Sequence, residues 1–447
     1  MTYILYYFLI PLSLNFIYIS ISLPFSLDSF PFVVYTYCIQ EPVIVLKGCI
    51  MLSDQNIFFI DCLRSAVHNT PLQKCNPPSE ELNTIMHCAE QHAVLPMIYD
   101  RLVPALPSPS PLLPWKQQAL MTVYHQTVRT QEFLRLNRLL AEADLKIPVV
   151  KGILCRHLYP QPDQRISGDE DLLVPDSAWN QMHAVLTEAG YIAQGDHDTQ
   201  VATYIHAGTG LRLEAHHHLF SDSSTAFRPL NRIFADVFSR MQPYEIDGTT
   251  VYGMCPTDHM LYLLFHAYKH FLHAGFGIRQ VCDINLYGCR YKEQIDWQYV
   301  QNILHSHYAD VFSAAVFTIG SVYLAFPEAA YLSVSSPDPE PLLNDILNGG
   351  LYGASSEDRQ HSSMITLHAF ESEKQSTVSH ILHTAFPPLD AMQGKYPYLL
   401  KAPALLPAAW IQRIGTYLFS GRKASAGESI RIGTERIALL RKYNMLP

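Results

Sequence analysis

The sequence predicts an α+β fold in which a small sheet is embedded in a largely helical chain. Apolar residues recur at helical spacing over most of residues 51–143. Two short runs, 166–174 and 211–219, have the pattern of strands, and both carry acidic residues. A further helical pattern begins near residue 256. Strands are therefore expected to form a minor part of the structure.

The composition is that of a globular protein with a large core. The chain has 447 residues, of which 48% are hydrophobic and 16% charged, enough for two or three packed units. The net charge is −9, and no run of Lys or Arg occurs. An extended nucleic-acid surface needs clustered cations, so we expect a small molecule or a protein as the partner. Nine cysteines without a C-x-x-C pair indicate reduced thiols in a cytoplasmic protein.

Residues 1–50 form an apolar extension. No charged residue occurs from Tyr3 to Phe25, a length that would allow a membrane span. Pro11 and the absence of flanking basic residues argue against one. We expect translation to begin at Met51, with a membrane anchor and a folded extension as the alternatives.

Residues 51–143 are predicted to form a helical scaffold without chemistry. A first helix carries an apolar stripe through Leu63 and Val67, and a second opens near Ser79, a candidate N-cap. After a Pro-rich link, a long helix is expected from Trp115 to Ala143. Its arginines at positions 129, 135 and 138 are interpreted as a solvated face.

The most informative stretch is 147–174. A short apolar run ends on Lys151 and Gly152, and a helix-compatible piece and a Pro-rich turn then lead into the second run, 166–174. Alternation on this run places Asp169 and Asp171 on one face and Glu170 on the other. Two carboxylates about 7 Å apart on one face repel each other unless a positive charge lies between them. A divalent cation is the obvious candidate.

A second acidic strand is predicted at 211–219. Alternation places Glu214, His216 and His218 on one face, and we take Glu214 as a third acid beside the D-x-D pair. The plainer interpretation is a solvated strand end. A helix from Asp176 or Ser177 to Ala189 is expected between the two strands.

Four histidines suggest an alternative metal site. His216 and His218 would share a strand face, and His266 and His270 are four apart on a predicted helix. A hydrolase with a metal held by these imidazoles is one alternative function. The pattern H-E-x-x-H is absent, which weakens it.

Several motifs together resemble a bacterial family of mostly uncharacterised nucleotidyltransferases within the polymerase-β-like superfamily. They are K-G, L-Y-P and R-x-x-x-D-x-D-L-L-V within 151–174, E-x-H at 214–216, and H-A-G-F-G-I-R-Q-V-C-D-I at 273–284. The resemblance implies a small mixed sheet of the nucleotidyltransferase (palm-like) type. It departs from the superfamily at Ile153, where a serine is usual, so no hydroxyl contact to the triphosphate is expected there.

The resemblance also implies an activity and roles for particular residues. The protein would move an NMP from an NTP to a hydroxyl group of a small molecule or protein and release pyrophosphate. Asp169, Asp171 and Glu214 would be catalytic and hold two Mg²⁺ ions. The expected nucleotide contacts are Lys151, Gly152, Arg165, His270 and Arg279. A simple ion pair between Arg279 and Asp283 and a catalytically silent binding module remain open as alternatives.

These predictions divide the chain into five parts. They are the extension 1–50, a helical region 51–143, the nucleotidyltransferase core 144–253, a helical region closing the cleft 254–336, and a helical or irregular region 337–447. In the last part a helix is expected over Glu428–Leu446.

Overall fold

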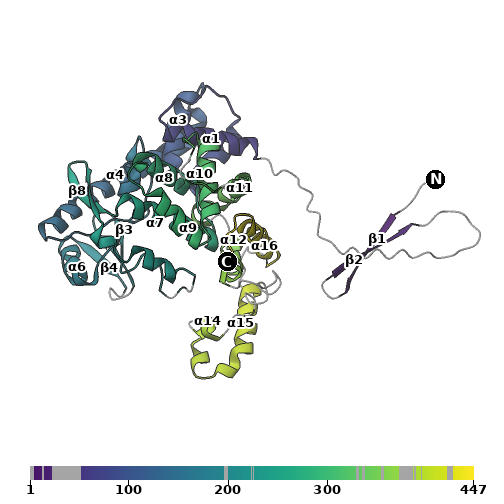
Figure 1. The fold of residues 1–447 in the computed structure, drawn as a ribbon. Helices are drawn as coiled ribbons and strands as arrows, with labels where there is room; N and C mark the ends of the chain where they lie inside the picture. Colours follow the sequence, from purple (N-terminus) through teal and green to yellow (C-terminus); the bar gives the residue numbers. More distant parts are fainter. Residues whose placement is uncertain are drawn as a thin grey trace, which may run out of the picture. The chain divides into compact units, whose positions relative to one another are not determined.

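The computed structural model in Figure 1 comprises two units, 1–50 and 51–447. It describes residues 5–12, 15–22, 52–195, 200–222, 224, 226–328, 332–334, 338–353, 357–371, 386, 389–393, 395–419 and 426–446. In the first unit, β1 (Leu5–Leu12) pairs antiparallel with β2 (Asn15–Ser22). The alternatives for the extension, namely a later translation start or a membrane anchor, stay predictions. Among the described residues, no helix is both long enough and apolar enough to cross a bilayer.

A four-stranded mixed sheet lies in the larger unit. Its order is β3 (Glu170–Leu173), β6 (Arg212–His216), β5 (Val201–His206) and β4 (Tyr191–Gln194). β3 runs parallel to β6, whereas the other neighbours are antiparallel. All four residues of β3 are buried, as expected for a strand covered on both faces. The predicted α+β class is confirmed.

A hairpin extends the sheet region beyond the other edge of β3. It consists of β7 (Gln242–Ile246) and β8 (Thr249–Gly253), and Val149 bridges both Leu172 and Gly253. The two-residue turn Asp247–Gly248 has φ of 48° and 72°, the positive values that a tight hairpin turn of this kind requires. The apolar run 147–150 thus joins the sheet to this hairpin through isolated bridges at Val149.

The amino-terminal helices largely follow the predicted pattern. They are α1 (Asp54–Val67), α2 (Ser79–Gln91), α3 (Leu95–Ala105) and α4 (Leu113–Glu142). Ser79 is not an N-cap: Pro78 holds that position and no side chain caps α2. The arginines of α4 do more than face solvent, because Arg135 donates to the carbonyl of Ala189 and Arg138 to the hydroxyl of Thr249.

Two large hydrophobic cores organise this unit. One joins the sheet to α4 and to α6 (Trp179–Glu188) (Figure 1). The other contains the remaining amino-terminal helices together with α7 (Pro256–His273), α8 (Ile278–Tyr291), α9 (Trp297–Ser306) and α10 (Asp310–Leu324). Leu173 of β3 belongs to this second core, so α7 packs over the strand face that carries Leu173 and Asp171.

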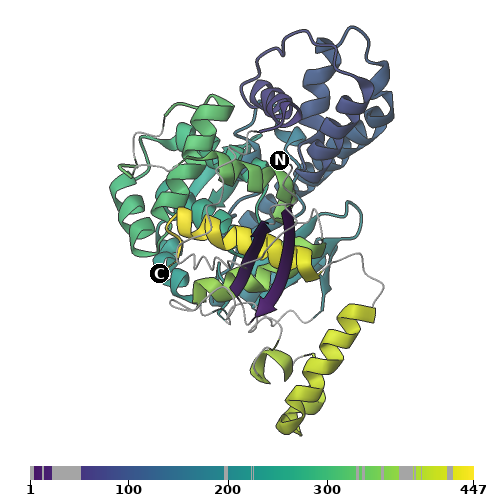
Figure 2. The same cartoon turned by 90° about the vertical axis from the view of Figure 1, so that its right-hand side faces the viewer.

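The carboxyl-terminal part is helical. Its longer elements are α11 (Glu340–Gly349), α12 (Glu357–Glu371), α14 (Leu389–Gln393), α15 (Leu406–Phe419) and α16 (Ala426–Lys442). Ile365 and Ala369 of α12 pack on Ile437 of α16, which is drawn in yellow in Figure 2. The helix predicted at 428–446 is confirmed as α16. The other predicted boundaries within 51–447 stay predictions.

Candidate functional site

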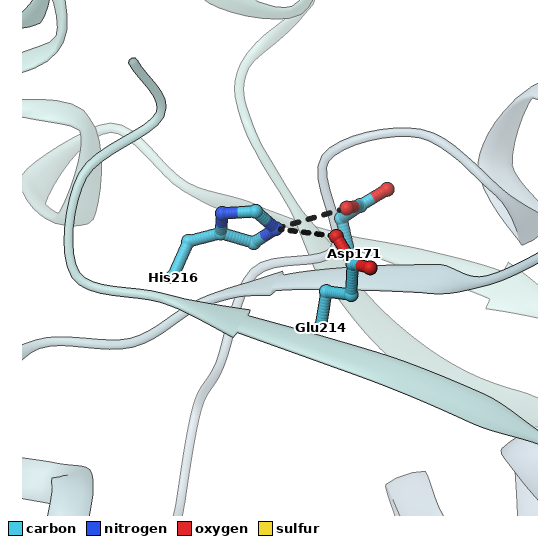
Figure 3. A group of neighbouring side chains, drawn as sticks. All are labelled: Asp171, Glu214 and His216. Carbon is cyan, nitrogen blue, oxygen red and sulfur yellow. Dashed lines mark hydrogen bonds and ion pairs between the residues drawn. The ribbon is translucent and has the colours of Figure 1, made fainter. Parts of the chain in front are cut away.

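Two carboxylates and an imidazole converge where β3 and β6 run side by side. The parallel register places Asp171 opposite Glu214 and Leu173 opposite His216. One ligand atom from each of Asp171, Glu214 and His216 lies within 4.8 Å of the other two (Figure 3). The Nε2 atom of His216 is 2.9 Å from Oδ1 of Asp171 and 3.8 Å from Oε2 of Glu214. Glu214 therefore lies on the same side of the sheet as Asp171.

The positive charge beside the D-x-D pair is an ammonium group. Nζ of Lys151 is 2.8 Å from Oδ2 of Asp171 and 3.9 Å from Oδ1 of Asp169. The electrostatic argument for a positive group between these acids thus holds, but a side chain provides that group. Lys151 was predicted to contact the nucleotide, whereas its charge is here directed at the acids.

Asp169 lies at the edge of the cluster. It precedes β3 and is 29% exposed, against 3% for Asp171. It is not one of the three converging ligands; His216 takes that place. The E-x-H alternation signalled His216, but the sequence argument gave this residue a ligand role only in the alternative metal site.

Burial controls the protonation of His216. Burial, with a smaller effect from the charges of Lys151 and Lys269 and against the opposing charge of Glu214, lowers the pKa of His216 to about 4. The imidazole is therefore neutral at pH 7, the form that ligates metal ions.

Helix α7 presents basic groups to these acids. Burial lowers the pKa of Lys269, the nearby charge of Lys151 adds to this effect, and Glu214 opposes it. The Nε2 atoms of His266 and His270 are 3.1 Å apart, and burial holds the pKa of both rings well below the usual range. His270, predicted to contact the nucleotide, lies within range of the charges of Lys269 and Lys151.

The carboxylate of Glu170 leaves no room for a side chain at position 152, so this position requires glycine. Its φ is +56°, and a Cβ atom there would lie 1.9 Å from Oε2 of Glu170. Glu170 is buried, accepts a hydrogen bond from the backbone N–H of Ile153 and pairs with Arg156 at 2.7 Å. The need to accommodate the Glu170 carboxylate is therefore an alternative reason for a glycine at position 152, beside its predicted contact with phosphate.

The two arginines that were predicted to contact the nucleotide, Arg165 and Arg279, are both buried. Arg165 is 4% exposed, and its guanidinium forms a fork to Asp283, with Nη2 2.6 Å from Oδ2 and Nε 3.2 Å from Oδ1. Arg279 is equally buried and donates to the carbonyl of Ile166. Both contacts help to hold the loop before β3, and the predicted contact of the two arginines with phosphate stays a prediction. Asp283 has its ion pair with Arg165 and not with Arg279.

The four-histidine metal site is not assembled. His218 lies beyond the end of β6 and its Nδ1 is 2.7 Å from Oδ2 of Asp222. In the part of the chain that the structure describes, the group that could hold a metal contains His216 but none of His218, His266 and His270. The alternation of the strand stops at His216, which is why the prediction failed for His218.

The donor set fits one divalent cation. Carboxylate oxygens suit Mg²⁺ and Mn²⁺, whereas imidazole is a more usual ligand of Zn²⁺ and Fe²⁺. Asp171, Glu214 and the neutral His216 would hold the ion, after Lys151 withdraws from Asp171. The residues that the structure describes provide one such group, so the prediction of two Mg²⁺ ions stays a prediction.

The fold and the cluster define a class: an α+β protein with a candidate divalent-cation site on a mixed sheet. Residues 78–319 match the model of a family described as uncharacterised nucleotidyltransferase. This match spans more than half of the chain, so the protein belongs to that family of nucleotidyltransferases. The bacterial origin and the wider superfamily stay predictions.

Two further comparisons add little. An antigenic nucleotidyltransferase-like protein from Paracoccidioides brasiliensis, known from its crystal structure, is 13% identical, with a TM-score of 0.30 over 46% of this chain and 96% of its own. Comparison with curated proteins gives no significant match.

Proposed function

We propose that the protein transfers an NMP from an NTP to a hydroxyl group of a small molecule or protein, with Mg²⁺ as the required ion. The observation that carries this proposal is the convergence of Asp171, Glu214 and His216 on one sheet face, beside the basic groups of α7. Membership of a nucleotidyltransferase family supports the class of reaction. An NTP substrate and free thiols favour a cytoplasmic location.

The residues at and around the cluster would have different roles in the transfer. Asp171, Glu214 and His216 would hold the cation, which supplies charge neutralisation on the triphosphate and lowers the pKa of the attacking hydroxyl. Lys269 and His270 would donate to phosphate oxygens. The hydroxyl oxygen forms a bond to the α-phosphorus, and the α–β anhydride bond breaks with its electron pair leaving on pyrophosphate. Asp169, the most exposed of the three acids, accepts the hydroxyl proton.

Label transfer tests the proposal directly. The protein is incubated with each α-³²P-NTP, Mg²⁺ and a cell extract, and we expect label on a metabolite or protein. Asp171→Asn and Glu214→Gln should abolish transfer and retain the fold, because they remove charge without changing shape. Glu293→Gln, an exposed acid paired with Lys292, is the control and should stay active. Wild-type protein that labels nothing with any NTP contradicts the proposal.

Two observations favour a catalytically silent binding module as the second candidate. Lys151 already neutralises Asp171, and Glu170 fills the space beside Gly152. Such a module would bind an NTP in calorimetry yet give no transfer. The metal hydrolase has no comparable support, since the candidate metal group among the described residues contains none of His218, His266 and His270.

A further inference from the structure

A cavity of about 600 Å³ opens where β3 and β6 end. Leu173, Val174 and Pro175 line it from the β3 side, and His217 and His218 from the β6 side. Leu173 pairs with His216 and lies two residues beyond Asp171, a separation of about 7 Å along the strand. The cavity therefore adjoins the acidic cluster and has the size of small-molecule sites, which are about 300–1,000 Å³.

The two acids that line the cavity are already engaged. Asp176 contacts Nδ1 of His217 at 2.7 Å, and the ring of His217 stacks on Trp179 with centroids 3.7 Å apart. Asp222 contacts Nδ1 of His218 at 2.7 Å. These contacts hold both imidazoles in place in the lining.

Asn231 anchors the same wall. It donates to Asp222 at 3.0 Å, and it exchanges hydrogen bonds with the backbone N–H and carbonyl of Phe220. The wall is therefore held in place before any ligand binds.

Two arginines supply the available positive charge. Arg228 and Arg232 both belong to the short 3-10 helix η4 (Arg228–Phe234) and both line the cavity. Neither makes an ion pair or a side-chain hydrogen bond with any residue that the structure describes. A guanidinium group forms a donor fork that matches the oxygens of a phosphate or carboxylate. Phe234, Val237 and Phe238 add an apolar surface suited to a carbon skeleton.

We infer that this cavity binds the acceptor substrate, and that the acceptor is a small hydroxyl compound carrying a phosphate or carboxylate group. Arg228 and Arg232 bind the anionic group, the apolar wall contacts the carbon skeleton, and the hydroxyl reaches toward Asp171. The inference rests on the proposed nucleotidyl transfer for the identity of the acceptor. The binding of an anion in this cavity does not depend on it.

Calorimetry without NTP or metal tests the inference. Glycerol 3-phosphate, glycerate and glycerol serve as probes that share a three-carbon skeleton and differ in their charged group. We expect the wild-type protein to bind one of the two anions and not glycerol, and the anion that binds identifies the acceptor as a phosphate or a carboxylate. In the double variant Arg228→Gln/Arg232→Gln the affinity should fall at least about tenfold, since two charge-assisted contacts are lost.

A matched control removes the same charge elsewhere. Lys116→Gln/Arg290→Gln changes two exposed residues outside the cavity and should bind the anion as the wild type does. Equal binding by the Arg228/Arg232 variant, or no binding of either anion by the wild type, overturns the inference. A failed label-transfer assay with intact, arginine-dependent anion binding would reject only the proposed reaction.

Discussion

The ammonium group of Lys151 lies 2.8 Å from Oδ2 of Asp171, on the strand face where a divalent cation is expected to bind. Asp171 is 3% exposed, and a buried carboxylate of this kind needs a counter-charge. Because lysine and cation would use the same carboxylate, the two compete. On the proposed function, we expect a bound cation to displace Lys151 from Asp171 and so to make it available for the phosphate contact that the sequence predicted.

Lys151→Gln should therefore strengthen metal binding while weakening transfer. Removing the competing ammonium group is expected to tighten Mg²⁺ binding in the absence of NTP on the order of tenfold, or about 1.4 kcal/mol. Calorimetry with Mg²⁺ measures this. Lys146→Gln, an exposed lysine over the ring of Tyr252, is the control and should leave the affinity unchanged. A Lys151→Gln variant that binds Mg²⁺ more weakly than the wild type would show that the two do not compete.

Gly152→Ala should be strongly destabilising. The substitution combines a positive φ with a Cβ atom 1.9 Å from a buried carboxylate oxygen, so we expect a loss of about 3 kcal/mol or more in the free energy of unfolding. Urea denaturation measures it. Gly248→Ala has a φ of +72° but open space, and should cost about 1 kcal/mol. Gly168→Ala has neither feature and should be close to neutral. Similar losses for Gly152→Ala and Gly248→Ala would mean that Glu170 moves aside freely.

Local pattern predicted the strands, and tertiary contacts decided the rest. Alternation along 166–174 and 211–219 correctly separated Glu170 from Asp171 and put Glu214 with His216, because side-chain direction in a strand is a local property. The partner of Arg165 was not readable, since Asp283 lies 118 residues away. The contact of Lys151 with Asp171 was not predicted for a related reason. Electrostatics requires a positive group beside the acids but does not identify that group.

Asp283→Asn should destabilise the protein by about 3–5 kcal/mol, since it leaves the guanidinium of Arg165 buried without its counter-charge. Burial alone raises the pKa of Asp283, but the charge and hydrogen bonds of Arg165 outweigh this and lower it. Tyr159 also donates to Asp283, at 2.8 Å. Urea denaturation gives the loss. Asp61→Asn breaks the half-exposed pair with Arg64 and should cost less than about 1 kcal/mol. Equal, small losses in both variants would contradict a structural role for the buried pair.

His92 should make stability fall on mild acidification. The ring is fully buried, accepts a hydrogen bond from the N–H of Ile278 and contacts the carbonyl of Leu347 at 3.2 Å. Burial lowers the pKa of His92 to about 4; the nearby Arg279 also lowers it, while the Leu347 carbonyl opposes this. A depressed pKa in the folded state means that the unfolded chain takes up the proton first. The contribution of His92 is therefore complete above about pH 6.5 and is lost as the pH falls toward 4.

His92→Gln should remove the contribution of one titrating group to the pH dependence of the free energy of unfolding. The free energy of unfolding of the wild type, measured in urea from pH 8 to pH 4, should fall below pH 6.5 with a slope to which His92 adds up to about 1.4 kcal/mol per pH unit. Burial lowers the pKa of His259 to about 3, so His259 acts in the same direction and part of the slope remains in the variant. His87→Gln, which changes an exposed histidine of α2, the helix whose C-cap is His92, should keep the full slope. Equal slopes for His92→Gln and the wild type would mean that His92 is protonated in the folded protein. A doubly protonated ring has no lone pair, so His92 could then not accept the hydrogen bond from the N–H of Ile278.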